Sequence, residues 1–219
     1  MARRNPLALA LAAVLAPVGA AALPAYEPGV AYIYDNGRVE QVRRVEGRTV
    51  TWAARSGRTY SRSVNPVAPI LSWSFRGESG VRRVVGDPDG LWPLQPGKQV
   101  RFRTVNDLRD EKGRRRRSVH LWTCMVLETE LTDTPAGRFE ATPIQCDRFS
   151  AGTMRVLERI TWRFSDEVGH YVAREARDMR DGDAEVYRLH AVLPAWEANR
   201  LRVEAVATEA SRTPRPASR

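Results

Sequence analysis

Turn-forming residues recur about every 8 to 14 positions in this chain, and apolar and polar side chains alternate in the segments between them. Asn36-Gly37 gives one of the clearest hairpin turns, because both residues tolerate positive φ. Frequent turns with a period-two alternation are typical of antiparallel β structure. The sequence therefore predicts an all-β protein: a single antiparallel curved sheet of about ten strands, as a half-barrel or a closed barrel, with one C-terminal helix.

The segments that carry the strand pattern are residues 30–34, 38–46, 48–54, 58–63, 70–76, 81–85, 99–105, 118–131, 138–148, 154–164, 170–177 and 184–193. After them the composition becomes helical, with Pro194 at a suitable first-turn position. We find no internal repeat and no domain linker. The predicted organisation is an antiparallel β domain at 26–194, a helix at 195–210 and a disordered tail at 211–219, which has no apolar pattern.

The N-terminus has the three parts of a secretory signal peptide. Arg3 and Arg4 precede an uncharged run over 7–22, and small residues follow at suitable cleavage positions. A membrane-spanning helix needs about 20 apolar residues, and Pro17 and Gly19 interrupt this shorter run. We therefore predict a signal peptide at 1–25, a periplasmic or secreted location, and no transmembrane segment in the mature chain.

The formal net charge is +9, and the basic residues are arginine except for Lys98 and Lys112. They are spread along the chain, mostly one or two at a time within strand-like segments. We attribute this excess to a GC-rich coding bias rather than to a nucleic-acid-binding surface. Export also argues against DNA or RNA as a partner, so the sequence predicts no nucleic-acid partner.

Cys124 and Cys146 are the only cysteines, and an oxidising compartment favours a disulfide between them. A hairpin turn centred on Pro135 would pair 131 with 139, 128 with 142, and 124 with 146, close enough for a disulfide. A bulge near Thr132 would shift the register and put the two sulfurs on opposite faces. Metal binding is disfavoured, because no Cys-x-x-Cys motif or histidine cluster accompanies the cysteines.

Several short motifs resemble an exported bacterial β-protein family of unknown function. They are Leu91-Trp92-Pro93-Leu94, Trp122-Thr123-Cys124, Thr134-Pro135-Ala136-Gly137-Arg138-Phe139, Cys146 and Val168-Gly169-His170-Tyr171-Val172. The signature of the family is a Pro-Ala-Gly-x-Phe hairpin tip, and the resemblance covers about 91–177. These are turn and packing residues, so the resemblance implies a fold and carries over no catalytic residue.

Two features are candidate binding surfaces. Arg114, Arg115, Arg116 and Arg117 form a run that we place in a loop, where they would bind an anionic lipid or an envelope protein, or else remain a solvated loop tip. Trp162 represents the strand tryptophans, which either line a pocket or pack in the core.

No catalytic signature is present. His120, His170 and His190 lie in three separate predicted strands, without the company that a metal site or a triad requires. Glu128, Glu130 and Glu158 could supply the paired carboxylates of a hydrolase, and Glu158 interrupts the apolar face of 154–164. We expect these carboxylates to form ion pairs with arginine instead. The sequence predicts no cofactor.

The leading interpretation is an exported, non-enzymatic envelope protein that binds an apolar or anionic envelope component, or a protein partner. One alternative is a hydrolase that uses Glu128 or Glu158 in a β cleft, and another is a structural envelope assembly factor. An apolar cavity open to solvent would favour the first, converging carboxylates the second, and a flat exposed apolar patch the third.

Overall fold

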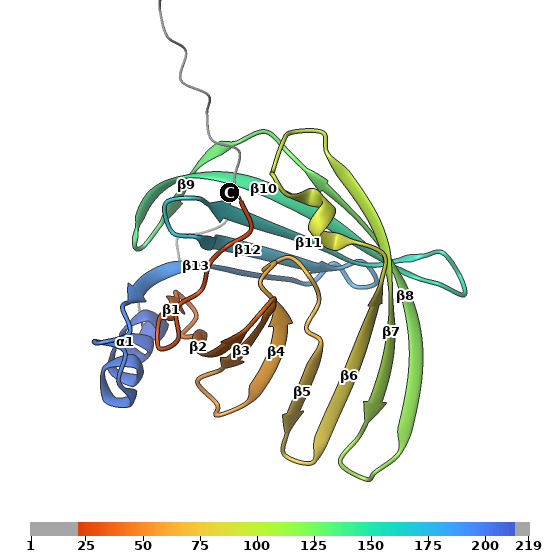
Figure 1. Cartoon of the computed structure of the whole chain (residues 1–219), viewed down its shortest axis with the longest axis horizontal. Helices are drawn as coiled ribbons and strands as arrows, with labels where there is room; N and C mark the ends of the chain where they lie inside the picture. Colours follow the sequence, from red (N-terminus) through yellow and green to blue (C-terminus); the bar gives the residue numbers. More distant parts are fainter. Residues whose placement is uncertain (1–21, 213–219) are drawn as a thin grey trace, which may run out of the picture.

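A computed structural model describes residues 22–212, and its sheet closes into a barrel (Figure 1). Twelve strands follow one another around the barrel in the order β11-β12-β13-β1-β2-β3-β4-β5-β6-β7-β8-β10, and β10 pairs with β11 to close it. The short strand β9 lies outside this ring and pairs with the first part of β10. The expectation of an all-β fold with a curved antiparallel sheet and one C-terminal helix is confirmed, in its closed form.

The elements in chain order are β1 (Ala31–Tyr34), β2 (Val39–Glu46), β3 (Thr49–Ala53), β4 (Thr59–Ser63), β5 (Ser72–Phe75), β6 (Glu78–Val85), the 3₁₀ turn η1 (Pro88–Leu91), β7 (Gln99–Arg109), β8 (Arg115–Val126), β9 (Glu130–Thr134), β10 (Gly137–Ser150), β11 (Val156–Ser165), β12 (His170–Asp178), β13 (Ala184–Leu193) and α1 (Arg200–Arg212). Residues 1–21 of the expected signal peptide and 213–219 of the expected tail lie outside the described residues. Within 22–212 no helix is long and apolar enough to cross a membrane.

The C-terminal helix covers the outer face of β1 and β13. Its buried side chains, Val203 and Val206 among them, pack against Ala31 and Ile33 of β1 in a small outer core. The alternate residue Tyr32 therefore faces the barrel interior, where it belongs to the main core. The period-two pattern of β1 thus builds two cores, one on each side of the sheet.

The helix begins later than expected. It starts at Arg200 rather than at 195, because the amide oxygen of Asn199 accepts a hydrogen bond from the backbone N–H of Arg202 and caps the first turn. Before it, the carbonyl of Pro194 accepts from the backbone N–H groups of Glu197 and Ala198. Pro194 therefore starts a separate turn and not the helix.

One end of the barrel is covered, and we call it the closed end. Tyr26 of the N-terminal segment, Val67 of the β4–β5 loop, and Leu91 and Trp92 around η1 are all buried in the main core. The side-chain amide of Asn65 ties the loop to η1, donating to the carbonyl of Pro88 and to a carboxylate oxygen of Asp89. Three segments far apart in sequence therefore cap this end.

The long strand expected at 118–131 is divided into β8 and β9 by an irregular connection at 127–129. In the β9–β10 hairpin, Leu131 pairs with Glu140 rather than with Phe139, so the turn is centred half a residue later than expected. The pairing of 131 with 139 was therefore wrong. The connection at 127–129 removes this shift before β8 begins to pair with β10.

The disulfide is confirmed. Cys124 of β8 pairs directly with Cys146 of β10, the two Cα atoms are 4.0 Å apart, and both residues are fully buried. The prediction named the correct partners because two shifts in strand register, each of one residue, cancel. One shift arises at the β9–β10 turn and the other at the connection between β8 and β9.

Candidate functional site

A row of polar side chains crosses the inner face of the barrel at the end opposite the closed end. It consists of Arg82 on β6, Asn106 on β7, His120 on β8, Arg148 on β10 and Glu158 on β11, and we call it the mouth cluster. Arg82 pairs with Asn106, and Arg148 pairs with Glu158. Each residue lies an even number of positions from a residue of its own strand that packs in the main core, so its side chain points to the same, inner face.

Hydrogen bonds fix the orientation of this row. The amide oxygen of Asn106 accepts from Nε of Arg82, so its amide nitrogen donates to Nδ1 of His120 at 3.1 Å. His120 must then carry its proton on Nε2. Glu158 accepts from Nε of Arg148 at 3.0 Å. The row therefore presents donors on Arg82, His120 and Arg148, and only one carboxylate.

Arg82 has no carboxylate partner among residues 22–212. Its other hydrogen bond goes to the backbone carbonyl of Ile70, at 3.0 Å, and its guanidinium lies 5.4 Å from the ring centre of Trp73. Burial, followed by the positive charges of Arg148 and Arg62, lowers the pKa of Arg82 to about 10. The same causes, burial and then Arg148 and Arg82, lower the pKa of His120. Arg82 is thus a cation at the mouth without a carboxylate partner within 22–212.

The opposite wall of the interior is lined with tyrosine and arginine. The Tyr187 ring lies 5.1 Å from the guanidinium of Arg38 and 5.7 Å from that of Arg174, and Arg174 also lies 5.6 Å from the Trp162 ring. On β4, Arg62 lies 5.8 Å from the Tyr60 ring. Several buried polar atoms here lack a hydrogen-bond partner within the described residues: the hydroxyls of Tyr60, Tyr171 and Tyr187, Nε1 of Trp162 and Nε of Arg62.

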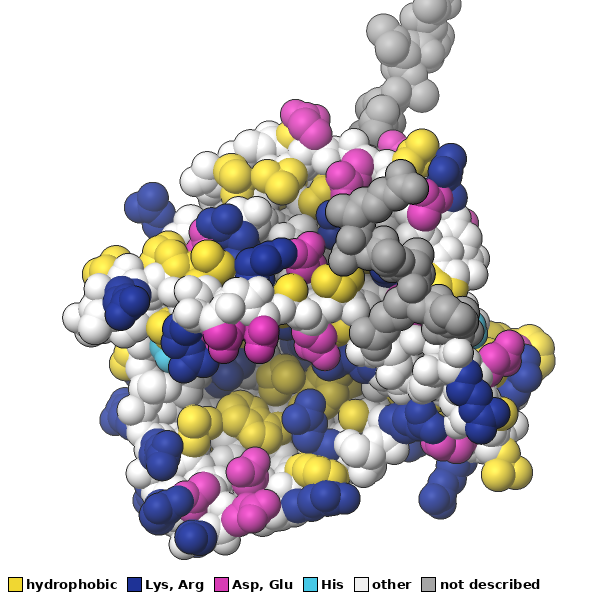
Figure 2. All heavy atoms as spheres, turned by 180° about the vertical axis from the view of Figure 1, so that it is seen from behind, with side chains coloured by type: hydrophobic (Ala, Val, Ile, Leu, Met, Phe, Trp, Pro, Cys, Tyr) yellow, Lys and Arg dark blue, Asp and Glu magenta, His cyan; other side chains and the backbone are white. Residues whose placement is uncertain are grey.

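The interior is open on the side of the mouth cluster. The Arg148 and Glu158 side chains are each 26% exposed although both face inward, and Arg174 is 16% exposed. Solvent can reach an inward-facing side chain only if that end of the barrel is not filled. Figure 2 shows the surface hollowed on the face opposite to that of Figure 1, with hydrophobic and basic side chains inside the hollow.

The closed end holds a second set of charges, which we call the closed-end network: Tyr26, Arg38, Glu40, Arg62 and His170. Glu40 is 1% exposed and accepts from Arg38 at 3.0 Å and from Nε2 of His170 at 3.4 Å. Nδ1 of His170 then accepts from the hydroxyl of Tyr26 at 2.8 Å. This network ties the N-terminal segment to β2 and β12.

The titration of the closed-end network follows from its pairing. Burial raises the pKa of Glu40, but Arg38, His170 and Arg62 outweigh burial and hold that pKa well below its usual range. For His170, burial is the largest effect and lowers the pKa, although Glu40 opposes it. Glu40 is therefore ionised and His170 neutral near pH 7, and each polar atom of this pair has a partner.

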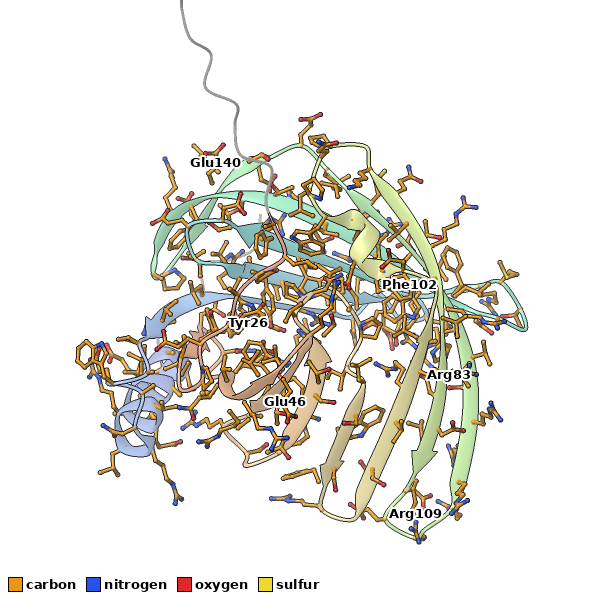
Figure 3. All side chains as sticks on the ribbon, viewed as in Figure 1. Tyr26, Glu46, Arg83, Phe102, Arg109 and Glu140 are labelled. Carbon is orange, nitrogen blue, oxygen red and sulfur yellow. A yellow bond between two sulfur atoms is a disulfide. The ribbon has the colours of Figure 1, made fainter. Side chains whose placement is uncertain are left out.

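The four candidate arginines lie elsewhere. Arg115, Arg116 and Arg117 belong to β8, and only Arg114 lies in the β7–β8 turn, so the placement of all four in a loop was wrong. The two strands continue pairing to a tight turn because exposed arginines are tolerated on both faces there. Figure 3 shows Arg109, at the end of β7, far from the packed centre that surrounds Phe102.

A shallow cavity of about 360 Å³ lies at this hairpin, lined by Gly80, Val81, Leu108, Arg116 and their neighbours. Arg114 forms an ion pair with Asp110 at 2.7 Å, and Arg117 lies 3.7 Å from Asp107. The hairpin therefore satisfies part of its own charge, and its cavity extends to Gly80, two residues before Arg82 on β6.

Trp162 lies in the main core, 5% exposed, with one face against Arg174. The carboxylates considered for catalysis are separated: Glu158 pairs with Arg148 inside the barrel, whereas Glu130 pairs with Arg163 at 2.6 Å outside it. The expectation of ion pairing is confirmed for these two, and Glu128 is exposed beyond the end of β8. Glu158 and Glu130 thus lie on opposite faces of the barrel wall.

Glu158 faces Asp178 of β12 across the strand pair. Hydrogen bonds from Arg180 lower the pKa of Asp178 to about 2, the opposite of what a general acid requires. Among residues 22–212, no group of three or more histidine, cysteine, aspartate or glutamate side chains is placed to hold a metal ion.

Sequence reasoning missed the mouth cluster. One signal was present: Glu158 interrupts an apolar strand face, and a buried charge on such a face calls for a partner. Arg82 and Arg148 gave no signal, because the sequence contains 35 basic residues and most strands carry some. Only the register shows which of them point inward.

No protein-family model matches the chain, and a search of curated proteins finds no match. The fold is similar to that of the hypothetical lipoprotein YmcC from Escherichia coli, with a TM-score of 0.51 at 10% identity, over 75% of this chain and 84% of that one. At this identity the likeness concerns the fold.

Two further structures align with TM-scores of 0.40. One, from Bacteroides fragilis, is described as exported with a YmcC-like fold and is 12% identical, over 77% of this chain and 97% of that one. The other, from Parabacteroides distasonis, is described as a lipoprotein and is 15% identical, over 76% of this chain and 96% of that one. The Pro-Ala-Gly-x-Phe tip as a family signature stays a prediction.

Proposed function

We propose that this chain is an exported, non-enzymatic envelope protein whose barrel binds a small envelope component through its open end. The observation that carries the proposal is the partial exposure of inward-facing side chains at the mouth, 26% for Arg148 and 16% for Arg174. A barrel built only for stability would fill this space with apolar side chains, since an interior normally packs to the density of an organic crystal.

The composition of the walls also supports binding. Ligand sites are mostly apolar or aromatic, with a few polar groups that fix orientation. The interior offers the partly exposed Trp73 as aromatic surface and the mouth cluster as its polar part. The hydrolase alternative is not favoured, because the inner carboxylate Glu158 is held by Arg148.

The test is to obstruct the interior and ask what no longer co-purifies. Ala176 of β12 is 8% exposed and faces inward beside Arg174. In Ala176→Trp the indole would occupy the mouth. Ala184→Trp adds the same indole at an exposed position on β13 and is the matched control. Each protein is purified from the native envelope, and the small molecules that it carries are identified by mass spectrometry.

We expect one compound class to be enriched with the wild type and with Ala184→Trp, and to be lost from Ala176→Trp. Val84→Trp, on the opposite wall, repeats the test if Ala176→Trp does not fold. Equal recovery from the wild type and both inner variants would refute binding in the barrel, as would the absence of any enriched compound from the wild type. The intact mass of the same wild-type sample tests export, which should remove about 20 to 25 residues.

A further inference from the structure

We infer that the barrel ligand carries an anionic group, and that Arg82, Arg148 and His120 of the mouth cluster hold it. This inference rests on the proposed function and adds the chemistry of the ligand. The groups that fit are a phosphate, a sulfate or a carboxylate, which share negative charge and several acceptor oxygens. The site is distinct from the arginine-rich β7–β8 hairpin.

The first argument is charge. Arg148 has one carboxylate partner, Glu158, whereas Arg82 hydrogen bonds only with the neutral acceptors Asn106 and Ile70. The positive charge of Arg148 also lowers the pKa of Arg82, so the two guanidinium groups repel each other. An isolated charge is costly to remove from water unless it is paired. An anion between the two guanidinium groups would pair Arg82 and remove the repulsion.

The second argument is the imbalance of donors and acceptors. Nε2 of His120 carries a proton, because Nδ1 accepts from Asn106. Nε1 of Trp162 and the hydroxyls of Tyr60 and Tyr187 also lack partners among the described residues, but these side chains are at most 5% exposed and do not reach the mouth. The donors available at the mouth are therefore Nε2 of His120 and the guanidinium groups, and a ligand rich in acceptor oxygens complements them better than a cationic one.

The third argument concerns the body of the ligand. Trp73 lies flat over Gly80, where an added Cβ would come within 2.2 Å of the indole, and Arg82 stacks above the same ring. Ile160 and Ala176 add apolar surface next to Arg148 and Glu158 along the strands. The mouth thus joins an apolar wall to a cationic one. It suits an amphiphile or a planar molecule with one anionic group.

Two dyes that differ by one charge separate this inference from the proposed function. 8-Anilino-1-naphthalenesulfonate is anionic, and N-phenyl-1-naphthylamine has the same aromatic skeleton without the sulfonate. Each is titrated into the mature protein, and fluorescence gives its dissociation constant at low and at 0.5 M salt. We expect the anionic dye to bind more tightly, and salt to weaken only the anionic dye.

Arg82→Met and Arg148→Met are the test variants, and Arg115→Met and Arg117→Met are matched controls on the outer face of the β7–β8 hairpin. Either test variant should weaken the anionic dye about tenfold or more, the factor for losing one charge-assisted hydrogen bond, and leave the neutral dye unchanged. Both controls should bind like the wild type. Circular dichroism confirms that each variant is folded, and either test variant alone suffices if the other is not.

The outcomes are distinguishable. If both dyes bind equally and neither test variant changes the anionic dye, the anionic inference is wrong and the barrel still binds ligands. If only the hairpin controls lose the anionic dye, the anion site lies on the β7–β8 hairpin and the inference is also wrong. If neither dye binds to the wild type, the proposed function fails and the inference fails with it.

Discussion

At the closed end of the barrel, Glu40 is 1% exposed and shares its two oxygens between Arg38 and His170, whereas at the mouth Glu158 is 26% exposed and has Arg148 alone. Both ends place glutamate, arginine and histidine on the inner face of the sheet. At the closed end Glu40 has two partners, its charge also acts on buried Arg62, and the network joins the N-terminal segment to the barrel. At the mouth, Arg82 has only neutral acceptors.

This difference indicates that the burial and the partners of the carboxylate, rather than residue type, separate structural charges from those available to a ligand. A buried charge must be paired within the protein, because an isolated one costs several kcal/mol. A partly exposed charge can be hydrated when no ligand is bound and can pair with a ligand when one binds. Substitutions at the closed end should therefore change stability, and the same substitutions at the mouth should change binding.

The largest expected effect is at Glu40. Glu40→Gln leaves Arg62 buried without a counter-charge and should lower the free energy of unfolding by about 3–5 kcal/mol. Glu158→Gln, the matched change at the mouth, should cost less than about 1 kcal/mol. Urea unfolding followed by tryptophan fluorescence measures both values. Similar costs for the two variants would remove the distinction between the two ends.

The disulfide lies in the wall between the two ends, and its loss should rank next. Cys124→Ala with Cys146→Ala should cost about 3 kcal/mol, since the bridge closes a loop with a sequence separation of 22. Urea unfolding followed by tryptophan fluorescence measures this cost as well. An unfolding free energy within about 1 kcal/mol of the wild type would show that the bridge does not constrain the unfolded chain as expected.

The third effect is a pH dependence that belongs to His170. Unfolded, its pKa is near 6.5; folded, burial lowers it, so the unfolded chain binds the proton more readily. Stability is then fully present above about pH 6.5 and is lost as the pH falls through the lowered folded pKa, with a slope of up to about 1.4 kcal/mol per pH unit. Glu40, whose pKa is lowered below the usual range, contributes its own loss only below about pH 4.5.

His170→Gln should flatten that slope between pH 7 and pH 5, as measured by urea unfolding at several pH values. His120→Gln is the comparison at the mouth and should flatten it less, because His120 is only half-buried. A slope that His170→Gln leaves unchanged would assign the pH dependence to another group.

A smaller effect is expected at Arg82. Arg82→Met removes a desolvated charge along with its hydrogen bonds, so the free energy of unfolding without ligand should change by less than about 1 kcal/mol. Arg62→Met at the closed end should cost about 2 kcal/mol or more, because it takes positive charge away from buried Glu40. Chemical denaturation of both variants, side by side, decides; a larger loss at Arg82 would contradict the assignment of the two ends.

The smallest effect concerns the outer hairpin. Replacing Arg114, Arg115, Arg116 and Arg117 with serine should change the free energy of unfolding by less than about 0.5 kcal/mol. The same variant should bind anionic vesicles more weakly at low salt if the hairpin contacts a membrane, at about 1 kcal/mol for each arginine near the surface. Co-sedimentation with vesicles measures this, and a wild type that does not bind would leave the hairpin as a solvated surface.

The sequence was sufficient to predict most of the strands and the curved sheet, because these depend on local turns and on alternation. The disulfide partners were predicted correctly because two register offsets cancel. Asn36-Gly37 marked its hairpin, and Cys146 lies opposite Cys124. The sequence could not show that the barrel closes, since closure depends on β10 pairing with both β8 and β11. The start of the helix was placed early because Pro194 and Asn199 both suit a helix N-terminus.

The candidate site was mostly out of reach from the sequence. The four adjacent arginines at 114–117 drew attention because they are neighbours in the chain. Arg82 and Arg148 are 66 positions apart, and the register of β6, β7, β8 and β10 places both on the inner face of the sheet. Whether an arginine faces in or out depends on strand phase, and one residue of slip reverses it. Glu158 was the one residue whose pattern already pointed inward.

The most direct test of the account is to locate a bound oxyanion. Crystals of the mature protein, soaked in selenate and measured at the selenium absorption edge, would show the anion in an anomalous difference map. We predict a peak between the guanidinium groups of Arg82 and Arg148, within hydrogen-bond distance of both, and no peak within the closed-end network. Peaks confined to the β7–β8 hairpin, with none at the mouth, would contradict the account.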